Sequence, residues 1–295
     1  MKYIKRQETF YPKKGENKMF DYHLHTKVSF DSKENPQNMV EKAEKLGLKE
    51  ICFTDHYDFN DVYKDRQDIF TIEQYRAVYD NLKSDTVKIR RGVEFGITEW
   101  NMTELKSLLD SYNFDFVLGS IHYAGGTDPY LKEYWNNITV PEAFEKYLLK
   151  TLECVKAHND FDVLGHLNYV CKSPFNPSHK AFTYNDYSDI CDEIMKVLVS
   201  KGKGMEINTS GVDRVGDYLP SKDFIKRFKE LGGEIITVGS DAHDASRIGQ
   251  YTNEAIAIAK DVFGYVCTFE NRKIIYHNGY CLSKHFCFDK KSSIL

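Results

Sequence analysis

Met19–His25, with the sequence MFDYHLH, is a short apolar run that ends in two histidines. On a β-strand, residues two apart point to the same face, so the imidazoles of His23 and His25 aim at one point. Two neutral imidazoles that converge in this way supply half of a metal site. The stretch therefore predicts a strand whose end carries metal ligands.

The rest of the chain repeats this pattern, because short apolar runs alternate with amphipathic runs of helical period. Strands are predicted at 19–25, 50–54, 87–93, 114–121, 162–165, 204–208 and 234–240, helices at 38–47, 72–82, 102–109, 141–157, 187–200, 221–231 and 254–263, and a terminal hairpin at 265–276. Such alternation is typical of α/β proteins with a parallel sheet. Most of the strands end in His, Asp or Glu. We favour a closed (β/α)7 barrel of the TIM type, because an open sheet would spread these residues along one edge.

Length and composition fit one large domain. The 295 residues are 41% hydrophobic and carry a net charge of −4, which gives no electrostatic reason to expect nucleic acid as a partner. We expect an N-terminal extension at 1–18, a barrel domain at 19–282 and a tail at 283–295. Seven cysteines without a C-x-x-C pair, no signal peptide and no run of membrane-spanning length favour a soluble cytoplasmic protein, monomeric or homodimeric.

The polar residues at the strand ends are candidate metal ligands. They are His23, His25, His56, Glu94, His122, His166, Asp241 and His243. One such histidine alone is more often a hydrogen-bonded structural residue, but eight N and O ligands are too many for one tetrahedral zinc. We therefore expect two to three divalent ions, with Glu94 bridging two of them. Ligands of this kind accept Zn, Mn and Fe alike.

Six motifs in order carry a resemblance. DYHLH (21–25), FTDH (53–56), GVE (92–94), GSIH (119–122), GHLN (165–168) and GSDAH (239–243) resemble those of the PHP (polymerase and histidinol phosphatase) superfamily. The run EINTSG (206–211) and SDAHDASR (240–247) are similar to its histidinol-phosphatase branch. The resemblance implies a distorted (β/α)7 barrel with a trinuclear metal centre at the carboxyl ends of the strands.

The same resemblance implies an order among the ligands. The first ion would be held by His23, His25, Glu94 and Asp241, the second by Glu94, His122 and His166, and the third by His56 and His243. Many members place a further His soon after the H-x-H pair, where this chain has none. Asp31 stands nearest, either as the third ion's remaining ligand or as a loop or capping residue.

The expected reaction is hydrolysis of a phosphate monoester by a metal-activated hydroxide, with Glu94, Asp241 and His243 as the catalytic residues. The resemblance alone names the substrate, L-histidinol phosphate of histidine biosynthesis. The sequence has no G-x-x-x-x-G-K or G-x-S-x-G motif for another mechanism. Alternatives are a different small phosphate ester, a nucleotide or a phosphotyrosyl protein as substrate, or a metal-binding regulatory protein without turnover.

Further residues have supporting roles in this hypothesis. Asp55 and Ser240 are candidates to accept the second N–H of a metal-bound histidine. For phosphate we favour Arg247, with Arg214 and Lys172 as weaker candidates, because guanidinium groups fit phosphate in a planar fork. Asn208 would either orient substrate or tie a loop. An acid for the ammonium of histidinol is also needed, and Asp58, Glu99 and Asp128 all remain open.

Overall fold

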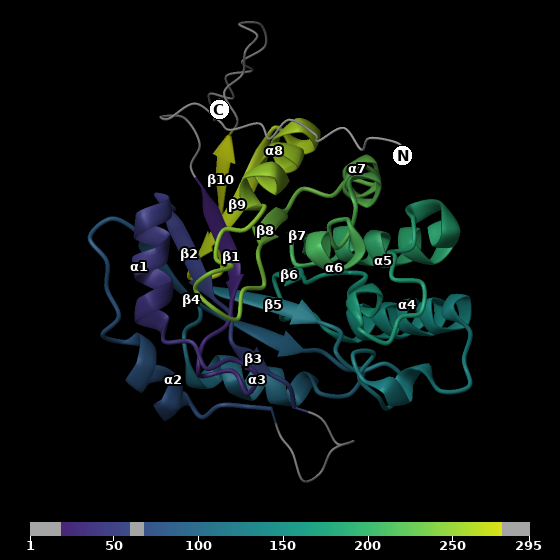
Figure 1. Ribbon diagram of the computed structural model, residues 1–295, viewed down its shortest axis with the longest axis horizontal. Helices are drawn as coiled ribbons and strands as arrows, with labels where there is room; N and C mark the ends of the chain where they lie inside the picture. The colour runs from purple at the N-terminus through teal and green to yellow at the C-terminus, as the bar shows by residue number, and fades with distance from the viewer. Residues whose placement is uncertain (1–18, 60–67, 279–295) are drawn as a thin grey trace, which may run out of the picture.

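A computed structural model describes residues 19–59 and 68–278. The expected extension at 1–18 and the tail at 283–295 lie outside these residues. Within them a central, mostly parallel sheet curves almost into a barrel, with helices packed around it (Figure 1). Its strands pair in the order β1 (Phe20–Leu24), β2 (Glu50–Phe53), β4 (Lys88–Gly96), β5 (Phe116–Ser120), β6 (Val163–Leu164), β7 (Gly204–Asn208) and β8 (Ile236–Gly239). The predicted distorted (β/α)7 barrel is confirmed.

The barrel closes between its first and last strands, at their carboxyl ends. The Asp241 N–H donates to the carbonyl of His23 at 2.9 Å, and the His25 N–H donates to the carbonyl of Ala242 at 2.9 Å. These two backbone bonds follow the end of β8, so the closing seam lies where the predicted ligands are. The seam brings the ligands of β1 beside those that follow β8.

The helices begin and end at recognisable sequence signals. They are α1 (Pro36–Leu46), α2 (Ile72–Tyr79), α3 (Met102–Ser111), α4 (Val140–Ala157), α5 (Ser188–Ser200), α6 (Gly211–Val215), α7 (Lys222–Glu230) and α8 (Thr252–Phe263). The side chain of Asn35 caps α1, which ends at Gly47 in the left-handed region. Thr139 and Glu142 form a capping box at the start of α4. The short α6, which the apolar period did not predict, follows β7 directly.

A short strand that the sequence did not predict places one of the histidines. β3 (His56–Tyr57) pairs with β4, so that His56 lies opposite Glu94. Thr54 and Asp55 interrupt the regular strand between β2 and β3, although the Thr54 N–H donates to the carbonyl of Leu24 at 2.8 Å and the Glu94 N–H donates to that of Asp55 at 3.1 Å. This interruption carries the imidazole of His56 beyond the end of β2 and toward the carboxyl end of β4.

The opposite end of the barrel is covered by the terminal hairpin of β9 (Tyr265–Glu270) and β10 (Lys273–Asn278), as predicted. The hydroxyl of Tyr22 contacts both Glu50 and the carbonyl of Phe269, and it accepts a hydrogen bond from the N–H of Phe269 at 3.0 Å, which ties β1 to the hairpin. Arg90 adds to this buried group by pairing with Glu50 at 2.7 Å and with Glu270 of β9 at 2.7 Å. These buried contacts hold the hairpin against this end of the barrel.

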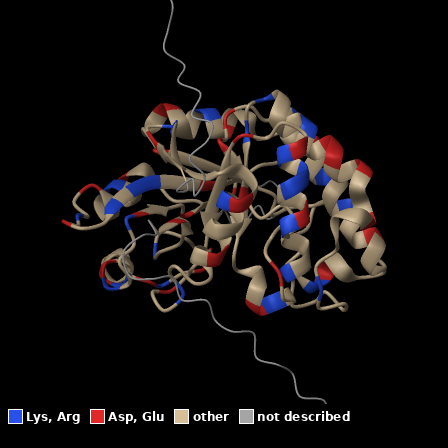
Figure 2. Cartoon of the chain, turned by 90° about the horizontal axis from the view of Figure 1, so that it is seen from above, with Lys and Arg blue, Asp and Glu red and all other residues tan. Residues whose placement is uncertain are grey.

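The outer surface mixes charges of both signs. Basic and acidic residues alternate over the helices when the molecule is seen from above (Figure 2). Within the described ranges, no helix combines the length and the apolar character that a membrane crossing demands.

The seam depends on a glycine. A Cβ added to Gly239 on β8 would lie 2.3 Å from the Cβ of His23 and 2.4 Å from Oε1 of Glu206. Both distances are too short for real atoms, so only glycine allows β8 to lie this close to the side chain of His23.

We predict that Gly239→Ala lowers the free energy of unfolding by about 1–3 kcal/mol, the usual cost of overpacking a dense interior. Urea unfolding followed by circular dichroism measures this change. An unchanged urea midpoint would contradict the close packing of β8 against His23.

Candidate metal centre

Glu94 lies at the centre of a group of histidines at the carboxyl ends of the strands. Its side chain is fully buried at the end of β4. Oε1 lies 2.8 Å from Nε2 of His166 and 3.3 Å from Nε2 of His122. Oε2 lies 3.1 Å from Nε2 of His23 and 3.4 Å from Nε2 of His25. The two oxygens therefore face two different sets of imidazoles, which is the geometry that a bridging ligand needs.

Several overlapping clusters have the geometry of metal sites, with ligand atoms within 4.8 Å of one another. They are His23, His25 and Asp241; His23, Glu94 and His166; His56, Glu94 and His122; and His25, Asp31, His56 and His243. The structure thus brings all nine predicted ligands together. The grouping differs from the predicted one in that His25 also joins the outer cluster and His56 also joins the inner one.

The donor atoms inside this group fit metal ions better than they fit one another. Nε2 of His23, Nε2 of His25, Nδ1 of His56 and Oε2 of Glu94 are buried and make no hydrogen bond in the described part of the chain. Buried polar atoms are normally satisfied, and leaving one unpaired is costly. Nitrogen and carboxylate donors that converge without partners are the arrangement that divalent ions complete.

The second ring nitrogen of most of these histidines has a partner that fixes the ring. Nδ1 of His23 lies 2.8 Å from Oε1 of Glu206, and Nδ1 of His122 lies 2.9 Å from Oδ1 of Asp58. Nδ1 of His25 lies 3.0 Å from the hydroxyl of Ser29. Such contacts leave Nε2 free to bind a metal ion and orient it.

The sequence did not identify these orienting groups. A signal existed for two of them, since Asp58 follows His56 by two residues and Glu206 precedes Asn208 by two, which places each pair on one face of a strand. Ser29 lies in a loop, where no periodicity applies.

The two predicted orienting residues differ from expectation. Asp55 contacts no ligand histidine directly: it accepts hydrogen bonds from the backbone N–H of Thr26 and the hydroxyl of Ser29, and so acts on His25 through Ser29. Ser240 makes no hydrogen bond to a histidine in the described residues. Its backbone N–H instead donates to Asp21. The hydroxyl of Ser240 is buried and makes no hydrogen bond in the described residues, so these contacts do not support the predicted role.

Asp31 lies at the outer edge of the group. Its Oδ2 is 2.9 Å from Nε2 of His243 and 3.6 Å from Nε2 of His56. Although partial burial opposes ionisation, the imidazoles of His56 and His243 hold the pKa of this carboxyl well below its usual range. Asp31 thus faces the imidazoles as a carboxylate rather than capping a helix.

Asp241 reaches the group from a strained backbone. Its φ is 56°, in the left-handed region that non-glycine residues seldom adopt. Oδ1 lies 3.4 Å from Nε2 of His25, and Oδ2 accepts a hydrogen bond from Lys172. Burial opposes ionisation, but Lys172 and His23 hold the pKa of Asp241 well below its usual range. Strain of this kind is typical of residues held for function.

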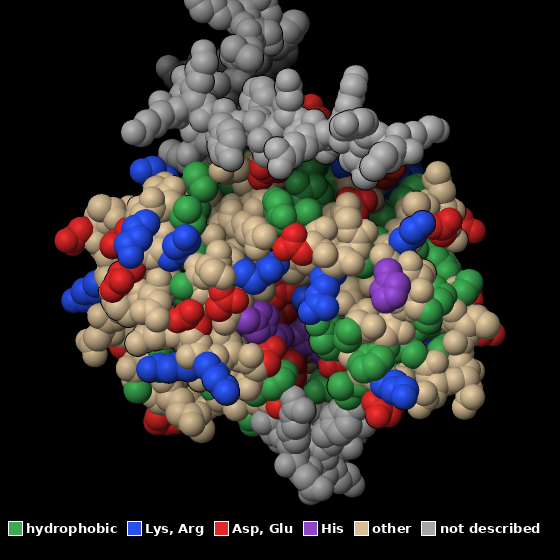
Figure 3. All heavy atoms as spheres, in the orientation of Figure 1, with side chains coloured by type: hydrophobic (Ala, Val, Ile, Leu, Met, Phe, Trp, Pro, Cys, Tyr) green, Lys and Arg blue, Asp and Glu red, His purple; other side chains and the backbone are tan. Residues whose placement is uncertain are grey.

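A cavity of about 550 Å³ opens from the histidines to the surface. Figure 3 shows this hollow, with histidine side chains at its floor and basic side chains at its rim. Lys172, Arg214 and Arg247 all line it. Lys172 is the deepest of the three, since its side chain is only 14% exposed and contacts Asp241. Arg247 lies at the rim, 3.0 Å from Asp213, so the residue that the sequence favoured for phosphate stands farther out than Lys172, one of the two weaker candidates.

Asn208 does not line the cavity. It is fully buried, and its Oδ1 accepts hydrogen bonds from the backbone N–H and the hydroxyl of Ser210 at 3.0 and 2.7 Å. Its amide nitrogen lies 3.2 Å from Glu206. Of the two roles considered, these contacts support the one in which Asn208 ties a loop.

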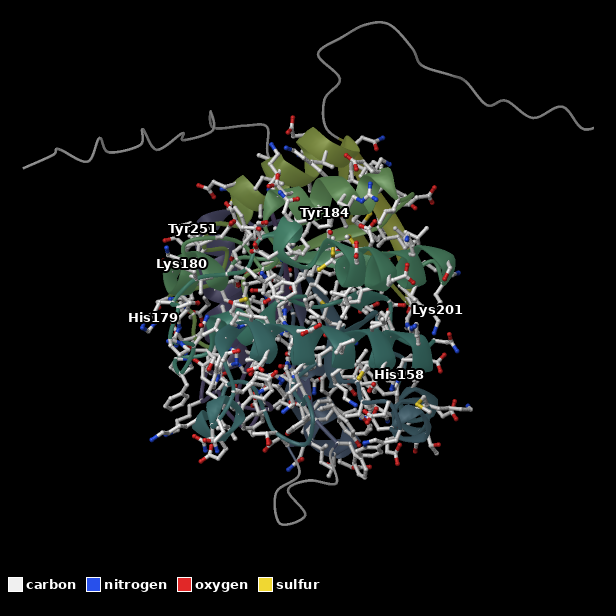
Figure 4. All side chains as sticks on the ribbon, turned by 90° about the vertical axis from the view of Figure 1, so that its right-hand side faces the viewer. His158, His179, Lys180, Tyr184, Lys201 and Tyr251 are labelled. Carbon is white, nitrogen blue, oxygen red and sulfur yellow. The ribbon has the colours of Figure 1, made fainter. Side chains whose placement is uncertain are left out.

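Other histidines lie away from this group. His158, which follows α4, contacts the carbonyl of Thr98 at 2.8 Å, and Lys201 donates to its carbonyl. His179 lies in a loop on another part of the surface (Figure 4). Neither of them follows a predicted strand. Position at a strand end was therefore the sequence feature that distinguished the candidate ligands from these two histidines.

Comparison with known proteins agrees with this geometry. The chain matches the model of the PHP domain over residues 21–210. A probable histidinol-phosphatase of Clostridium acetobutylicum is 35% identical over 258 residues, which cover 88% of this chain and 99% of that protein. The histidinol-phosphatase of Lactococcus lactis subsp. lactis is 34% identical over 264 residues, which cover 87% of this chain and 96% of that protein.

Solved structures share the fold. The crystal structure of histidinol phosphate phosphatase from Lactococcus lactis, complexed with Zn, L-histidinol and phosphate, matches with a TM-score of 0.73 and 32% identity, covering 88% of this chain and 99% of that one. The structure of a putative histidinol phosphatase from Listeria monocytogenes has a TM-score of 0.68 at 18% identity, covering 79% of this chain and 99% of that one, and speaks for the fold alone. From the domain match, the relatives and the barrel together, the chain belongs to the PHP domain family.

Proposed function

We propose that this protein is a metal-dependent phosphomonoesterase that hydrolyses L-histidinol phosphate to L-histidinol and phosphate in histidine biosynthesis. The observation that carries the proposal is the convergence of nine ligand-type side chains, six of which line a cavity whose wall also holds Lys172. The names of the curated relatives support the choice of substrate.

The residues of the clusters would hold two to three divalent ions, with zinc favoured by the Lactococcus complex and with Mn or Fe equally compatible with N and O donors. When bound, such ions lower the pKa of water to near neutrality and neutralise the oxygens of a phosphate group. Glu94, which belongs to two of the clusters, would serve ions in both, Asp241 would hold an ion with His23 and His25, and His243 with Asp31 would help to hold the outermost ion.

The side chains of the cavity wall would bind the phosphate of the substrate. Lys172 is buried, and although burial lowers its pKa, the carboxylates of Asp241 and Glu94 raise it, so the ammonium stays charged. Its charge lies directly beside the ligand cluster, where phosphoryl transfer needs it. Arg214 and Arg247 stand farther out and would guide the phosphate inward.

A cytoplasmic location is part of the proposal. The cysteines of the described residues, at 52, 154, 171, 191 and 267, are all free and buried. Free thiols of this kind are compatible with a reducing compartment, where disulfides seldom persist.

The first test measures phosphate release from L-histidinol phosphate beside a panel of sugar phosphates, nucleotides and a phosphotyrosyl peptide, using protein loaded with Zn or Mn. We expect kcat/KM of at least about 10⁴ M⁻¹s⁻¹ for L-histidinol phosphate, within the range of ordinary enzymes.

Removing metal with a chelator is expected to abolish release and to lower the melting temperature, because ligands that bind only the folded state stabilise it. A preference for another ester would discard the substrate and keep the metal centre.

Glu206→Gln tests the role of the group that orients His23. Since such partners fix the ring and raise the basicity of the ligand, we expect metal affinity or activity to fall by about 10- to 100-fold. Metal content after dialysis, measured by mass spectrometry, gives a readout independent of turnover. Glu193→Gln, which changes an exposed carboxylate paired with Lys196, serves as the matched control and should change neither.

Lys172→Met removes the deepest cation and keeps most of the side chain's volume. We expect kcat/KM to fall by about 100-fold or more, as when a preorganised donor to a developing charge is removed. The same change at the rim, Arg247→Met, should cost less, since that guanidinium is more exposed and shared with Asp213. Steady-state phosphate release compares the two variants. A larger loss of kcat/KM for Arg247→Met than for Lys172→Met would contradict the view that the deeper cation contributes more to catalysis.

A further inference from the structure

The proposed substrate carries an ammonium group beside its phosphate ester, so its binding site needs an anion as well as cations. The cavity offers several acids, and most are already engaged. Asp58 contacts His122 at 2.9 Å, and Asp213 contacts Arg247 at 3.0 Å and Gln250 at 3.0 Å. Asp31 and Asp241 belong to the ligand clusters. None of these four is free to pair with a ligand's ammonium group, and Asp68, which also lines the cavity, has an interaction partner as well.

Asp128 differs from these acids in its contacts. Its Oδ1 accepts hydrogen bonds from the backbone N–H of Tyr130 at 2.7 Å and from the hydroxyl of Tyr169 at 3.2 Å. Both bonds are to the same oxygen, and both donors are neutral. Across residues 19–59 and 68–278, Oδ2 of Asp128 makes no hydrogen bond and no Lys, Arg or His pairs with this carboxylate. Asp128 lines the cavity, so Oδ2 is available to a ligand there.

Tyr169 sets the distance of Asp128 from the ligand cluster. The ring of Tyr169 packs against His166 and His122, with centroids 5.0 and 5.2 Å apart. Nζ of Lys172 lies over the same ring, 5.4 Å from its centroid. The hydroxyl at the far end of the ring reaches Asp128. One tyrosine ring therefore separates the cationic, phosphate-binding end of the cavity from an anionic end.

In the unliganded protein, the carboxylate of Asp128 is partly buried without a cation beside it, so binding a cation there is favourable. Burial raises the pKa of the Asp128 carboxyl, because removing a carboxylate from water costs free energy that the hydrogen bonds from Tyr130 and Tyr169 and the imidazole of His122 only partly offset. A cationic ligand that enters the cavity would supply the missing partner through a charge-assisted hydrogen bond.

From this geometry we infer that Asp128 is the residue that selects the substrate, by binding an ammonium group two carbons from the phosphate ester while the metal cluster and Lys172 bind the phosphate. The inference rests on the proposed function and names the substrate class as amino-alcohol phosphates, in preference to neutral or anionic phosphate esters. Glu99, another acid near the strand ends, pairs with Lys150 at 2.9 Å and does not line the cavity.

The test combines one substitution in the protein with one change in the substrate and measures whether their effects on kcat/KM depend on each other. Phosphate release is measured for L-histidinol phosphate and for its desamino analogue, imidazolylpropyl phosphate, with the metal-loaded wild type, Asp128→Asn and Glu99→Gln. A hydrogen bond to a charged group predicts that the wild type prefers the ammonium ester by about 10- to 100-fold in kcat/KM. Asp128→Asn should bring this ratio close to one, and the matched control Glu99→Gln should keep it.

Two outcomes overturn the inference: a wild type that treats both esters alike, or an Asp128→Asn variant that keeps the preference. The wild-type comparison needs no variant, so it decides the matter even if Asp128→Asn does not fold. Calorimetric binding of L-histidinol to the wild type and to Asp128→Asn separates the two proposals. Weaker binding by the variant supports Asp128 even if neither ester is hydrolysed, which would remove the proposed function alone, whereas equal affinity overturns Asp128 even if hydrolysis is fast.

Discussion

The buried carboxylate of Glu94 is the constraint on which the rest of the structure depends. A fully buried charge is tolerated only where partners surround it, and Glu94 finds them on strands that are far apart in the sequence. Those partners can meet on one carboxylate only if the sheet curves until its first and last strands touch. The closed barrel and the ligand cluster are therefore two aspects of one requirement, and the glycine at 239 satisfies it where the strands come closest.

Much of the fold could be predicted because its signals are local. The alternation of apolar runs and the helix caps depend on residues close in the chain, and the observed helices and strands follow them within a few residues. The ligand set, apart from Asp31, could be predicted because its members lie at or soon after the ends of predicted strands, and the ends of parallel strands gather on one side. β3 could not be predicted in this way, since the pairing of His56 with Glu94 depends on where the chain re-enters the sheet after Asp55.

The substrate-binding and orienting residues could not be predicted, because their roles depend on how deeply each side chain lies in the cavity. Sequence position places Lys172 and Arg247 equally near the strand ends, but only the packed structure shows that Lys172 is enclosed beside Asp241 while Arg247 reaches the rim. In the same way, Asn208 ends a strand and is nevertheless covered by the loop that it holds. Ser240 follows Gly239, and its hydroxyl makes no hydrogen bond to the imidazoles within the described residues. The backbone conformation after each strand decides which side chain contacts a ring nitrogen, and the spacing of apolar residues does not predict that conformation.

The closing seam also sets the order in which the site can be assembled during synthesis. His25 and Asp31 come early in the chain, and Asp31 is 212 residues before His243, its partner in the outer cluster. At the usual speed of translation, on the order of 10 to 40 s pass between the emergence of these two residues. Until then His23 and His25 lack both the carboxylate of Asp241 and the contact with β8 that closes the barrel beside them. Tight capture of metal is therefore a property of the finished barrel, and the ions act on the last stage of folding rather than as a nucleus for the first.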